Sequence, residues 1–493
     1  MKKAQERKMT EKLMFRLLPI QILLAGVSAV NGIVTSLFAS NSIGEEAMSA
    51  IGLYGPVNML MGAVSTILVG GCMILCGQHM GKNETGKIQS IFSLDILLSI
   101  IAGVLFILFH LYTGFFTDGS LLTSDLSLWP VFRIYLLGEA FDILPEILGG
   151  QLAAFLSLEN QTKRTTSASL IFIAVNTLLC FLFLRVMDLG VLGLALAEAL
   201  GRWIFFLVQL LHYFSKKSSL KFSFRHPDWK AALPVIKIGA PSGMTYVYQS
   251  FRGIIVNSLI LAHAGNAGLS AFTAANSFLN LFWAVPAGMT AVSRLLISVS
   301  TGEEDRQTLT DTMRTAMFRF VPLMALIDAV IILLASPVSS LYFHQASETC
   351  TLMSQCLRIL PLCMPLSTIY LHFNCYYQSD NRQIPVHILA VLDGVASVAG
   401  FSYLLASLMG VAGICIANVL NGVVTTLVII AYAWMKKKRL PRNMDELMVI
   451  PDDFGAPPSE RMKVSTPVAT PRWLRSTAFC TEMVATGKVV PAP

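Results

Sequence analysis

Long apolar segments recur along the chain and are separated by short polar connections. Each segment reaches the roughly 20 residues that a helix needs to cross a hydrocarbon core about 30 Å thick. Six fall at roughly 13–38, 50–78, 88–114, 128–157, 165–184 and 190–214, and six more at roughly 234–263, 270–300, 311–335, 350–378, 383–407 and 411–435. These runs are much longer than the alternating strands of a membrane barrel. The pattern predicts an all-α membrane protein with twelve transmembrane helices.

Basic residues gather in every second connection between these segments. They include Lys82, Lys163, Lys216, Lys217, Arg225, Arg306, Arg382 and Lys436, whereas the intervening connections hold only Arg185. Positive charge accumulates in cytoplasmic loops, so we expect a multi-pass protein of the cell (inner) membrane with both termini cytoplasmic. The predicted organisation is a cytoplasmic start (1–12), two six-helix bundles (13–214 and 234–435) joined by a cytoplasmic linker (215–233), and a disordered, proline-rich cytoplasmic tail (436–493).

The two halves repeat each other at a nearly constant offset. Ser49-Ala50 recurs as Ser270-Ala271, and 270 minus 49 is 221. Glu159-Asn160 recurs as Asp380-Asn381 at the same offset, and Gly190-Val191 recurs as Gly410-Val411, where 410 minus 190 is 220. Because each half has an even number of spans, both bundles enter from the same face. We therefore expect a pseudo-two-fold axis along the membrane normal and a cleft between the bundles.

Composition narrows the function. Hydrophobic residues make up 54% of the chain and charged residues only 13%, with a mean hydropathy of +0.65, which excludes a water-soluble enzyme domain of this length. The net charge of +7 is spread over loops, so we expect no nucleic-acid partner. Nine scattered cysteines and the absence of hydrolase, redox or metal-ligand motifs predict no enzyme activity, no metal and no cofactor. The expected partners are a small-molecule substrate and the lipid bilayer, and we expect a monomer.

Ionisable residues within the apolar segments are the first candidate site. Glu139, Asp142 and Glu146 are spaced by three and four residues, which places them on one face of the fourth helix. Charged groups at this depth are expensive unless they face a bundle interior or a wet cavity. Crowding of like charges would favour proton uptake there, so we treat the three as ion-coupling candidates.

The seventh helix supplies a second candidate site. Arg252 lies deep in this helix with Gln249 one turn earlier, and it corresponds to Asn31 of the first helix because 252 minus 31 is 221. We expect these residues to line the cleft. Arg252 then either meets the face of Glu139 and Asp142, or holds an anionic substrate group, or forms a fixed internal ion pair.

Other ionisable residues are more isolated along the chain. Glu198 and Arg202 are four apart on the sixth helix, so we expect an ion pair, with Glu198 a further ion-coupling candidate. Asp393 and Asp328 are single acids without an evident partner, and both are candidate proton sites. Asp95 lies near a predicted cytoplasmic end, from which we expect it to reach the headgroups.

The two six-helix halves, the polar loop after the second helix of each half, Val175-Asn176 and Gly190-Val191-Leu192-Gly193 resemble the multidrug and toxic compound extrusion (MATE) family. This family lies within the superfamily that includes lipid-linked oligosaccharide flippases. The resemblance covers residues 13–435. It implies two bundles around a V-shaped cleft that exports organic cations or other amphipathic solutes against entry of protons or sodium ions.

Two positions depart from the family pattern. Members of the family usually carry an Asp in the first helix, where this chain has Asn31. They commonly carry another Asp four residues after the fifth-helix Asn, here Asn176, and this chain has Cys180 at that position. The resemblance makes Asn31, Asn176 and Cys180 candidates for the substrate pathway. An amide and a thiol cannot titrate as carboxylates do, so we expect the fourth-helix acids to replace them.

Three functions fit the sequence. The first is ion-coupled antiport that exports drugs or other amphipathic solutes by alternating access. The second is a flippase for a lipid-linked anionic substrate, for which Arg252 is the telling residue. The third is a membrane sensor that does not transport and signals through the cytoplasmic tail.

Overall fold

Every regular element in the described part of the chain is helical. The computed structural model describes residues 2–81, 84–120, 122–159, 161–215, 218–222, 227–302, 305–380, 382–450 and 454, so Lys82, Lys216, Lys217, Arg225 and most of the predicted tail lie outside it. The first half, here the N-lobe, contains α1 (Lys2–Ser42), α2 (Glu45–Gly81), α3 (Thr85–Phe116), α4 (Trp129–Glu139), α5 (Ile143–Leu158), α6 (Thr162–Cys180) and α7 (Gly190–Tyr213). The second half, the C-lobe, contains α8 (Ala232–Gly302), α9 (Arg306–Thr315), α10 (Val321–Leu333), α11 (Ala335–Tyr342), α12 (Glu348–Ile359), α13 (Cys363–Ser379), α14 (Gln383–Val391), α15 (Ser397–Lys437) and α16 (Met444–Met448). Short 3-10 or π segments extend or join them: η1 (Leu126–Leu128), η2 (Phe181–Val186), η3 (Trp229–Ala231), η4 (Ala316–Phe320), η5 (Leu360–Leu362) and η6 (Leu392–Ala396).

The described helices supply twelve membrane spans. Eight helices are long and apolar enough to cross a membrane, and the bent pair Leu126–Glu139 and Ile143–Leu158 makes a ninth. Two of these stretches, of 52 and 54 residues, each break at a non-helical glycine and so form two spans apiece. The apolar part of α1 adds the remaining one. The predicted fold class is confirmed.

The repeat is visible in the backbone of the turns. Gly44 and Gly265 have φ of 112° and 55°, and Gly190 and Gly410 have φ of 56° and 57°. These are left-handed conformations that glycine adopts at little cost. The members of each pair stand 221 and 220 residues apart, which matches the sequence repeat. Equivalent connections of the two halves therefore both contain a glycine with positive φ.

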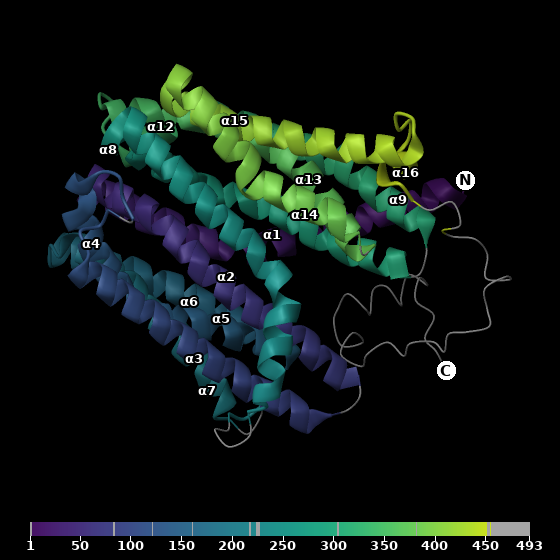
Figure 1. Cartoon of the computed structure of the whole chain (residues 1–493), viewed down its shortest axis with the longest axis horizontal. Coiled ribbons are helices and arrows are strands. Elements are labelled where there is room, and N and C mark those ends of the chain that lie inside the picture. Colours follow the sequence, from purple (N-terminus) through teal and green to yellow (C-terminus); the bar gives the residue numbers. More distant parts are fainter. Residues whose placement is uncertain are drawn as a thin grey trace.

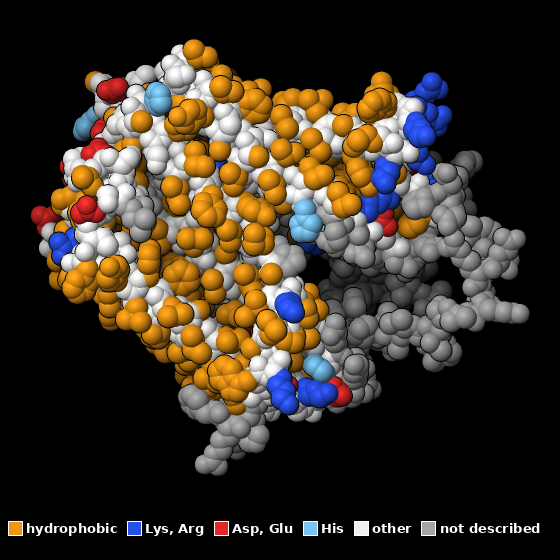
Figure 2. Space-filling view, viewed as in Figure 1, with side chains coloured by type: hydrophobic (Ala, Val, Ile, Leu, Met, Phe, Trp, Pro, Cys, Tyr) orange, Lys and Arg blue, Asp and Glu red, His pale blue; other side chains and the backbone are white. Residues whose placement is uncertain are grey.

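The two lobes diverge toward one end of the molecule. In Figure 1, α3, α5 and α7 form one arm and α13, α14 and α15 the other, with the amino terminus, α9 and α16 on the diverging side. Figure 2 shows hydrophobic side chains covering the middle of the molecule, and Lys and Arg side chains gathered at the ends of both arms. We call this diverging side the inner end, and the opposite side, predicted to be extracellular, the outer end.

Contacts between the lobes close the outer end. The Ser36 and Tyr342 hydroxyls lie 3.3 Å apart, and Asn41 Nδ2 donates to the Leu341 carbonyl at 2.9 Å. Ser49 Oγ donates to the Asn266 carbonyl at 3.2 Å. One buried apolar cluster here draws side chains from both halves.

Near the inner end, the first helix of each lobe packs against the other lobe. Met14 of α1 is buried among C-lobe side chains that include Met289 and Phe320. Conversely, the start of α8 lies directly on α2, because a Cβ on Gly71 would stand 2.0 Å from the Val235 carbonyl oxygen and one on Gly239 would stand 1.9 Å from the Ile67 carbonyl oxygen. Small residues permit such close backbone approach between membrane helices.

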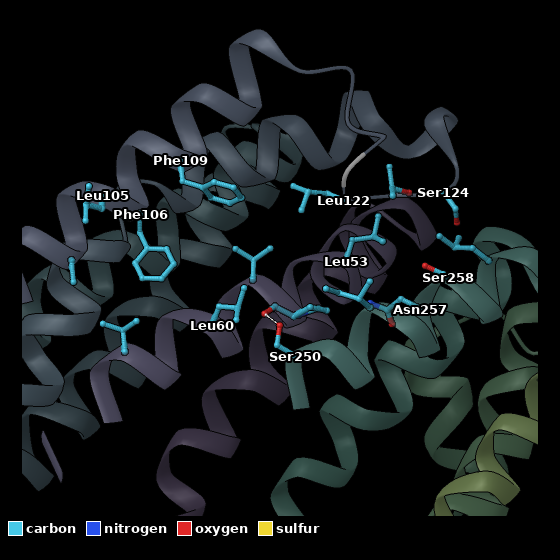
Figure 3. Close-up of a pocket in the computed structure, with 17 residues that line it drawn as sticks. Leu53, Leu60, Leu105, Phe106, Phe109, Leu122, Ser124, Ser250, Asn257 and Ser258 are labelled. Atoms are coloured by element: carbon cyan, nitrogen blue, oxygen red, sulfur yellow. Dashed lines mark hydrogen bonds between the residues drawn. The ribbon is translucent and has the colours of Figure 1, made fainter. Parts of the chain in front are cut away.

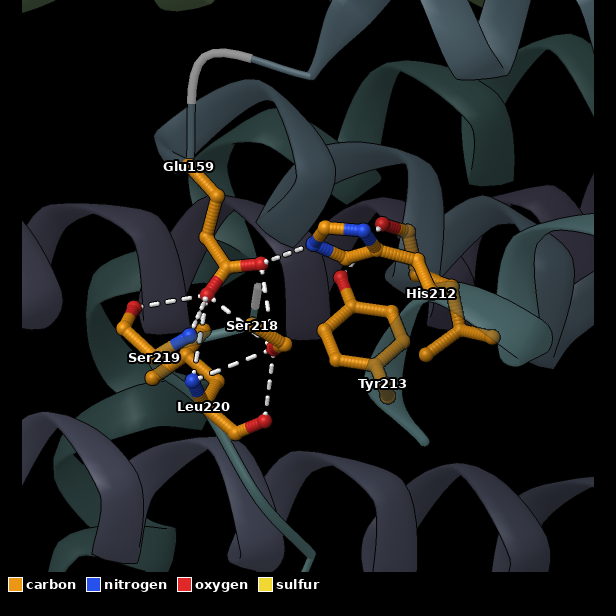
Figure 4. Close-up of polar contacts among 7 residues, drawn as sticks. Glu159, His212, Tyr213, Ser218, Ser219 and Leu220 are labelled. Atoms are coloured by element: carbon orange, nitrogen blue, oxygen red, sulfur yellow. Dashed lines mark hydrogen bonds and ion pairs between the residues drawn. The ribbon is translucent and has the colours of Figure 1, made fainter. Parts of the chain in front are cut away.

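A carboxylate holds the connection between the lobes against the N-lobe. Glu159, after α5, accepts hydrogen bonds from His212 Nε2 at 2.6 Å, from the Ser219 amide at 2.6 Å and from the Leu220 amide at 3.1 Å (Figure 4). Ser218 Oγ also donates to it, at 3.1 Å. Burial raises the pKa of the Glu159 carboxyl, but these hydrogen bonds outweigh burial and hold the pKa below its ordinary value.

The beginning of the tail is folded, contrary to expectation. Helix α16 docks on the C-lobe with Met444, Met448 and Ile450 buried. Its Asp445 accepts hydrogen bonds from Arg306 Nε at 3.0 Å and from Thr310 Oγ1 at 2.7 Å. The prediction of disorder is wrong for Met444–Ile450, while Phe454 is the last described residue.

In both halves, the connection after the fourth span at the inner end binds the segment that leaves the lobe. In the C-lobe, Arg382 pairs with Asp380 at 2.6 Å and donates to the carbonyls of Met448 and Val449 at 3.1 and 2.8 Å. Asp380 is the repeat partner of Glu159. Each lobe therefore fastens the segment that follows its sixth helix.

Candidate functional site

A cavity of about 560 Å³ lies between the lobes. Its wall combines α2 of the N-lobe with α8, η5, α13, η6 and α15 of the C-lobe, and it includes the predicted residues Gln249, Arg252 and Asp393. Amides form much of the remaining polar lining, contributed by Asn257, Asn276, Asn280, Asn418 and Asn421. The sequence analysis missed these amides, although an Asn inside an apolar span is itself a signal of a polar contact.

Arg252 presents its charge to this cavity. Its Nη1 donates to the Asp393 main-chain carbonyl at 3.2 Å, and Asp393 Oδ1 accepts from Asn421 Nδ2 at 2.8 Å. No carboxylate oxygen of the described residues lies within 4.0 Å of the guanidinium. The cavity thus holds one guanidinium and one carboxylate that do not form a direct ion pair.

A helix that contains a proline, α2, contributes to this cavity and to a second one. Pro56 in α2 lacks the amide hydrogen that would bond to the Gly52 carbonyl. Asn257 Nδ2 on α8 donates to that carbonyl instead, at 2.8 Å, and Ser250 Oγ donates to the Pro56 carbonyl at 2.7 Å. Pro56 and Asn257 contribute to the walls of both cavities.

The second cavity, also about 560 Å³, is mainly apolar and lies among α2, α3 and α8. Figure 3 shows Leu105, Phe106 and Phe109 of α3 on one side of it, and Leu60 and Ser250 close together on the other. Leu105 is 61% exposed, on a helix long and apolar enough to face lipid. This cavity therefore opens on the surface that the bilayer would cover.

The fourth-helix acids form a charge cluster around Arg202 inside the N-lobe. Arg202 lies 3.3 Å from Asp142 Oδ2, 3.4 Å from Glu146 Oε1 and 3.2 Å from Glu198 Oε1. Glu139 and Asp142 are each 2% exposed, and in the described part of the chain one oxygen of each has no hydrogen-bond partner. Three carboxyl groups therefore pair with one guanidinium, and the carboxyl group of Glu139 lies within electrostatic reach of them without an ion pair to Arg202.

A break in the fourth span positions these acids. Helix α4 ends at Glu139 and α5 begins at Ile143, with a bend of 46° between the two segments. Trp203 Nε1 on α7 donates to the Phe141 carbonyl at 3.1 Å, which satisfies a group in the break. Gly138 lets α4 approach α7, because a Cβ there would lie 2.6 Å from the Ala195 Cβ.

The charge cluster and the inter-lobe cavity occupy equivalent positions in the two repeats. At the offset of 221, Glu139, Asp142 and Glu146 correspond to Leu360, Cys363 and Ser367. All three of these C-lobe residues line the inter-lobe cavity, and the span that contains them is broken at η5, Leu360–Leu362. At the offset of 220, Glu198 corresponds to Asn418, which also lines the cavity. At this position of the repeat, the N-lobe has the charged residues of the Arg202 cluster, and the C-lobe has residues that line the inter-lobe cavity.

The remaining pathway candidates form a chain of hydrogen bonds in the N-lobe. Asn176 Nδ2 donates to Asn31 Oδ1 at 2.8 Å and lies 3.1 Å from Thr35 Oγ1. Cys180 Sγ donates to Asn176 Oδ1 at 3.6 Å. Asn31, Asn176 and Cys180 are buried and line neither of the two cavities described above.

Several sequence expectations need correction. Arg252 does not meet Glu139 and Asp142, because Arg202 occupies that place. The Glu198–Arg202 pair is present, but it is one part of a larger cluster. Asp95 does not reach the headgroups: it is fully buried and accepts a hydrogen bond from Cys72 Sγ at 3.3 Å. Among the residues that the structure describes, no group of three His, Cys, Asp or Glu side chains could hold a metal ion.

The fold matches solved MATE structures. An inward-facing multidrug-resistance MATE transporter superposes with a TM-score of 0.78 at 18% identity, covering 89% of this chain and 99% of that one. An outward-facing one superposes with a TM-score of 0.65 at 20% identity, covering 89% and 96%. A transporter from Pyrococcus furiosus, whose title reports a binding pocket of reverse polarity, gives 0.67 at 20% identity over 89% and 96%. These likenesses establish the twelve-helix, two-lobe fold.

Curated relatives are named as multidrug transporters. A probable multidrug resistance protein NorM of Bacillus licheniformis is 23% identical over 58% of this chain and 64% of its own length. The multidrug export protein MepA of Staphylococcus aureus is 25% identical over 50% and 54%. The chain thus matches less than two thirds of the length of these relatives. The MatE family model matches residues 21–182 and 241–404, one segment in each lobe. Because it covers both repeats of a two-lobe membrane fold, this chain belongs to the MatE (MATE) family of transporters.

Proposed function

We propose that the protein exports amphipathic organic solutes by alternating access, driven by the entry of protons or sodium ions. The observation that carries this proposal is the inter-lobe cavity, whose wall combines residues of both halves such as Pro56 and Arg252. The lobes meet at the outer end through Ser36, Tyr342 and Asn41 and diverge at the inner end. A rocking motion that breaks the outer contacts would expose the cavity to the opposite side.

The Arg202 cluster is the proposed coupling site. Four carboxyl groups against one guanidinium would leave a net charge of about −3 if all were ionised, which buried protein does not tolerate. Some of these groups therefore carry protons, and Glu139 and Asp142 are the best candidates because one oxygen of each has no partner in the described structure. Asn31 and Cys180 belong to a separate hydrogen-bond network with Asn176, and neither side chain is a carboxylate that could supply the same charge.

The substrate is proposed to be amphipathic because polar and apolar cavities adjoin. Asn257 and Pro56 contribute to both walls. Arg252 favours an anionic group on the substrate, since its side chain faces the cavity without a carboxylate partner. This observation supports the second candidate function, translocation of a lipid-linked anionic substrate.

Flux into proteoliposomes under an imposed pH or sodium gradient tests the proposal. We expect uptake of a fluorescent organic cation or of a fluorescent alkyl sulfonate. Glu139→Gln combined with Asp142→Asn should abolish the dependence on the gradient, whereas Glu46→Gln, an exposed acid on α2, should not change it. Binding of either probe without flux in the wild type would overturn the exporter and support a sensor.

Arg252→Ala separates the two substrate classes. Loss of sulfonate transport with retained cation transport would assign the cavity to anions. The opposite pattern would remove the anionic candidate, because Arg252 is the guanidinium that faces the cavity.

A further inference from the structure

The inter-lobe cavity carries two opposite charges that do not form an ion pair with each other. Arg252 and Asp393 are the charged side chains among the described residues of its wall. The Arg252 guanidinium donates to the main-chain carbonyl of Asp393, and the Asp393 carboxylate accepts from Asn421 Nδ2. Each charge is therefore held in place by a neutral group and remains able to bind a charged group of a ligand.

The fold itself does not require these two charges. At the offset of 221 residues, Arg252 corresponds to Asn31 and Asp393 corresponds to Phe172. The N-lobe forms its six spans with an amide and a phenyl group at these positions. Because charged side chains within membrane spans are costly, we look for their role in what the cavity binds.

Asn421 adds an acceptor without a donor to the same wall. It is 5% exposed, and within the described structure its Oδ1 has no hydrogen-bond partner. Because its Nδ2 donates to Asp393 Oδ1 at 2.8 Å, Asn421 Oδ1 and Asp393 Oδ1 are at most about 5 Å apart. An ammonium group can bridge two oxygens at this separation, since a charge-assisted N–H···O bond is about 2.8 Å long.

We propose that the inter-lobe cavity recognises a zwitterion: Arg252 binds the anionic group of the ligand, and Asp393 together with Asn421 binds its ammonium group. This proposal rests on the export function proposed above and names the substrate class of the same cavity. The two charges of the ligand must lie close together, because Arg252 contacts the main chain of the residue that carries the opposite charge. An aminocarboxylate meets this condition.

Ligands with a single charge fit this wall less well. In a cavity of low dielectric constant, a cation at Asp393 is repelled by Arg252, and an anion at Arg252 is repelled by Asp393. A zwitterion gains both attractions and leaves neither charge of the cavity unpaired. The same two residues therefore attract a zwitterion and disfavour its singly charged analogues.

The remaining wall fits an apolar part of the ligand. Phe272 and Trp283 contribute aromatic side chains to the cavity. Small-molecule sites commonly combine apolar and aromatic surface with a few polar groups that fix the orientation of the ligand. We therefore expect an aminocarboxylate that carries an aromatic or aliphatic group.

Three fluorescent probes that share one apolar group test this proposal. The compound ε-dansyl-lysine carries an aminocarboxylate, dansyl cadaverine lacks its carboxylate, and dansyl aminohexanoate lacks its amino group. Fluorescence titration of the full-length protein in nanodiscs, corrected with empty nanodiscs, measures their affinities. We expect ε-dansyl-lysine to bind at least about tenfold more tightly than either analogue, because it makes one more charged hydrogen-bonding contact.

Two variants should change this preference in opposite ways. Arg252→Gln should bind dansyl cadaverine at least as tightly as ε-dansyl-lysine, because the ligand carboxylate loses its partner. Asp393→Asn should bind dansyl aminohexanoate at least as tightly as ε-dansyl-lysine, because the ligand ammonium loses its partner. Glu46→Gln and Arg133→Gln, which neutralise exposed residues outside the cavity, should keep the preference of the wild type.

A variant that only disturbs folding would weaken the binding of all three probes alike. Such a uniform loss in both cavity variants, or equal affinities of the three probes for the wild type, would overturn the proposal. Zwitterion preference without flux in proteoliposomes would refute the exporter and leave the site in place. Flux of an organic cation without zwitterion preference would refute only the site, so the two failures are distinguishable.

Discussion

Arg202 shows what a single residue adds to the predicted site. The spacing of Glu139, Asp142 and Glu146 predicted a shared face, and the structure pairs Asp142 and Glu146 with Arg202 and keeps Glu139 within electrostatic reach of them. The spacing could not reveal which helix supplies the counter-charge, because several helices carry an Arg. Arg202 was assigned to Glu198 alone, since sequence separation shows neighbours on one helix but not contacts between helices.

Removal of Arg202 should destabilise the N-lobe. Arg202→Gln would leave Asp142, Glu146 and Glu198 without their shared cation, a loss of about 3 kcal/mol for a buried network. We expect a lower melting temperature in detergent at neutral pH. Arg133→Gln is the control, because Arg133 stacks on Phe115 at 5.9 Å without an ion pair in the described structure. Equal melting temperatures for both variants would contradict the assigned role of Arg202.

The Glu159 contacts predict a pH-dependent stability. A carboxyl with a lowered pKa stabilises the fold above the ordinary Glu pKa of 4.5, and this contribution disappears as the pH falls through the lowered value. Glu159→Gln should therefore lower the melting temperature at pH about 7, and the difference from wild type should shrink toward pH about 3. Glu46→Gln, at an exposed position, should show no such difference. A difference that grows on acidification would show that the carboxylate is not stabilising.

At the scale of elements, the long spans were predictable and the breaks within them were not. Apolar length alone located the helices that contain α2, α3 and α7. The breaks at Glu139–Ile143 and at η5 depend on contacts such as Trp203 with the Phe141 carbonyl, which compensate for lost helical hydrogen bonds. Helix α16 was missed because five residues are too few to give a periodic signal.

Burial of α16 leads to a prediction about the tail. Met448 is fully buried in the C-lobe cluster, so Met448→Ala should reduce stability by about 2–4 kcal/mol. Met435→Ala, at a position 63% exposed, should have little effect. Thermal unfolding of the two variants measures the difference. If both unfold like wild type, α16 does not contribute to the packed core.

At the scale of the whole molecule, the offset of 221 residues related the lobes correctly. Gly44 with Gly265 and Gly190 with Gly410 confirm the repeat in the backbone. The same offset relates the Arg202 cluster to the inter-lobe cavity. This relation could be recognised only after the structure had shown where the cavity lies. The exchange of α1 and α8 was not predictable, because every apolar helix offers a similar surface to its neighbours.

Locking the outer end should stop transport. Ser49 and Asn266 are hydrogen bonded across the lobes, so Ser49→Cys with Asn266→Cys can be joined through two disulfides by a short bifunctional methanethiosulfonate. Flux into proteoliposomes should fall after cross-linking and return after reduction. Each single variant treated in the same way should retain its flux. Full transport by the cross-linked double variant would contradict alternating access at this end.

The exchanged helices also bear on how such a protein can be assembled. Either half alone would expose the surface that its neighbour's first helix covers, around Ile67 in one case and Phe320 in the other. The halves resemble two subunits of a swapped dimer that share one polypeptide. If the chain is cut within 223–226 and expressed as two fragments, we accordingly expect the fragments to reassemble in the membrane. The exchanged helices α1 and α8 would hold them together without the peptide that joins the lobes.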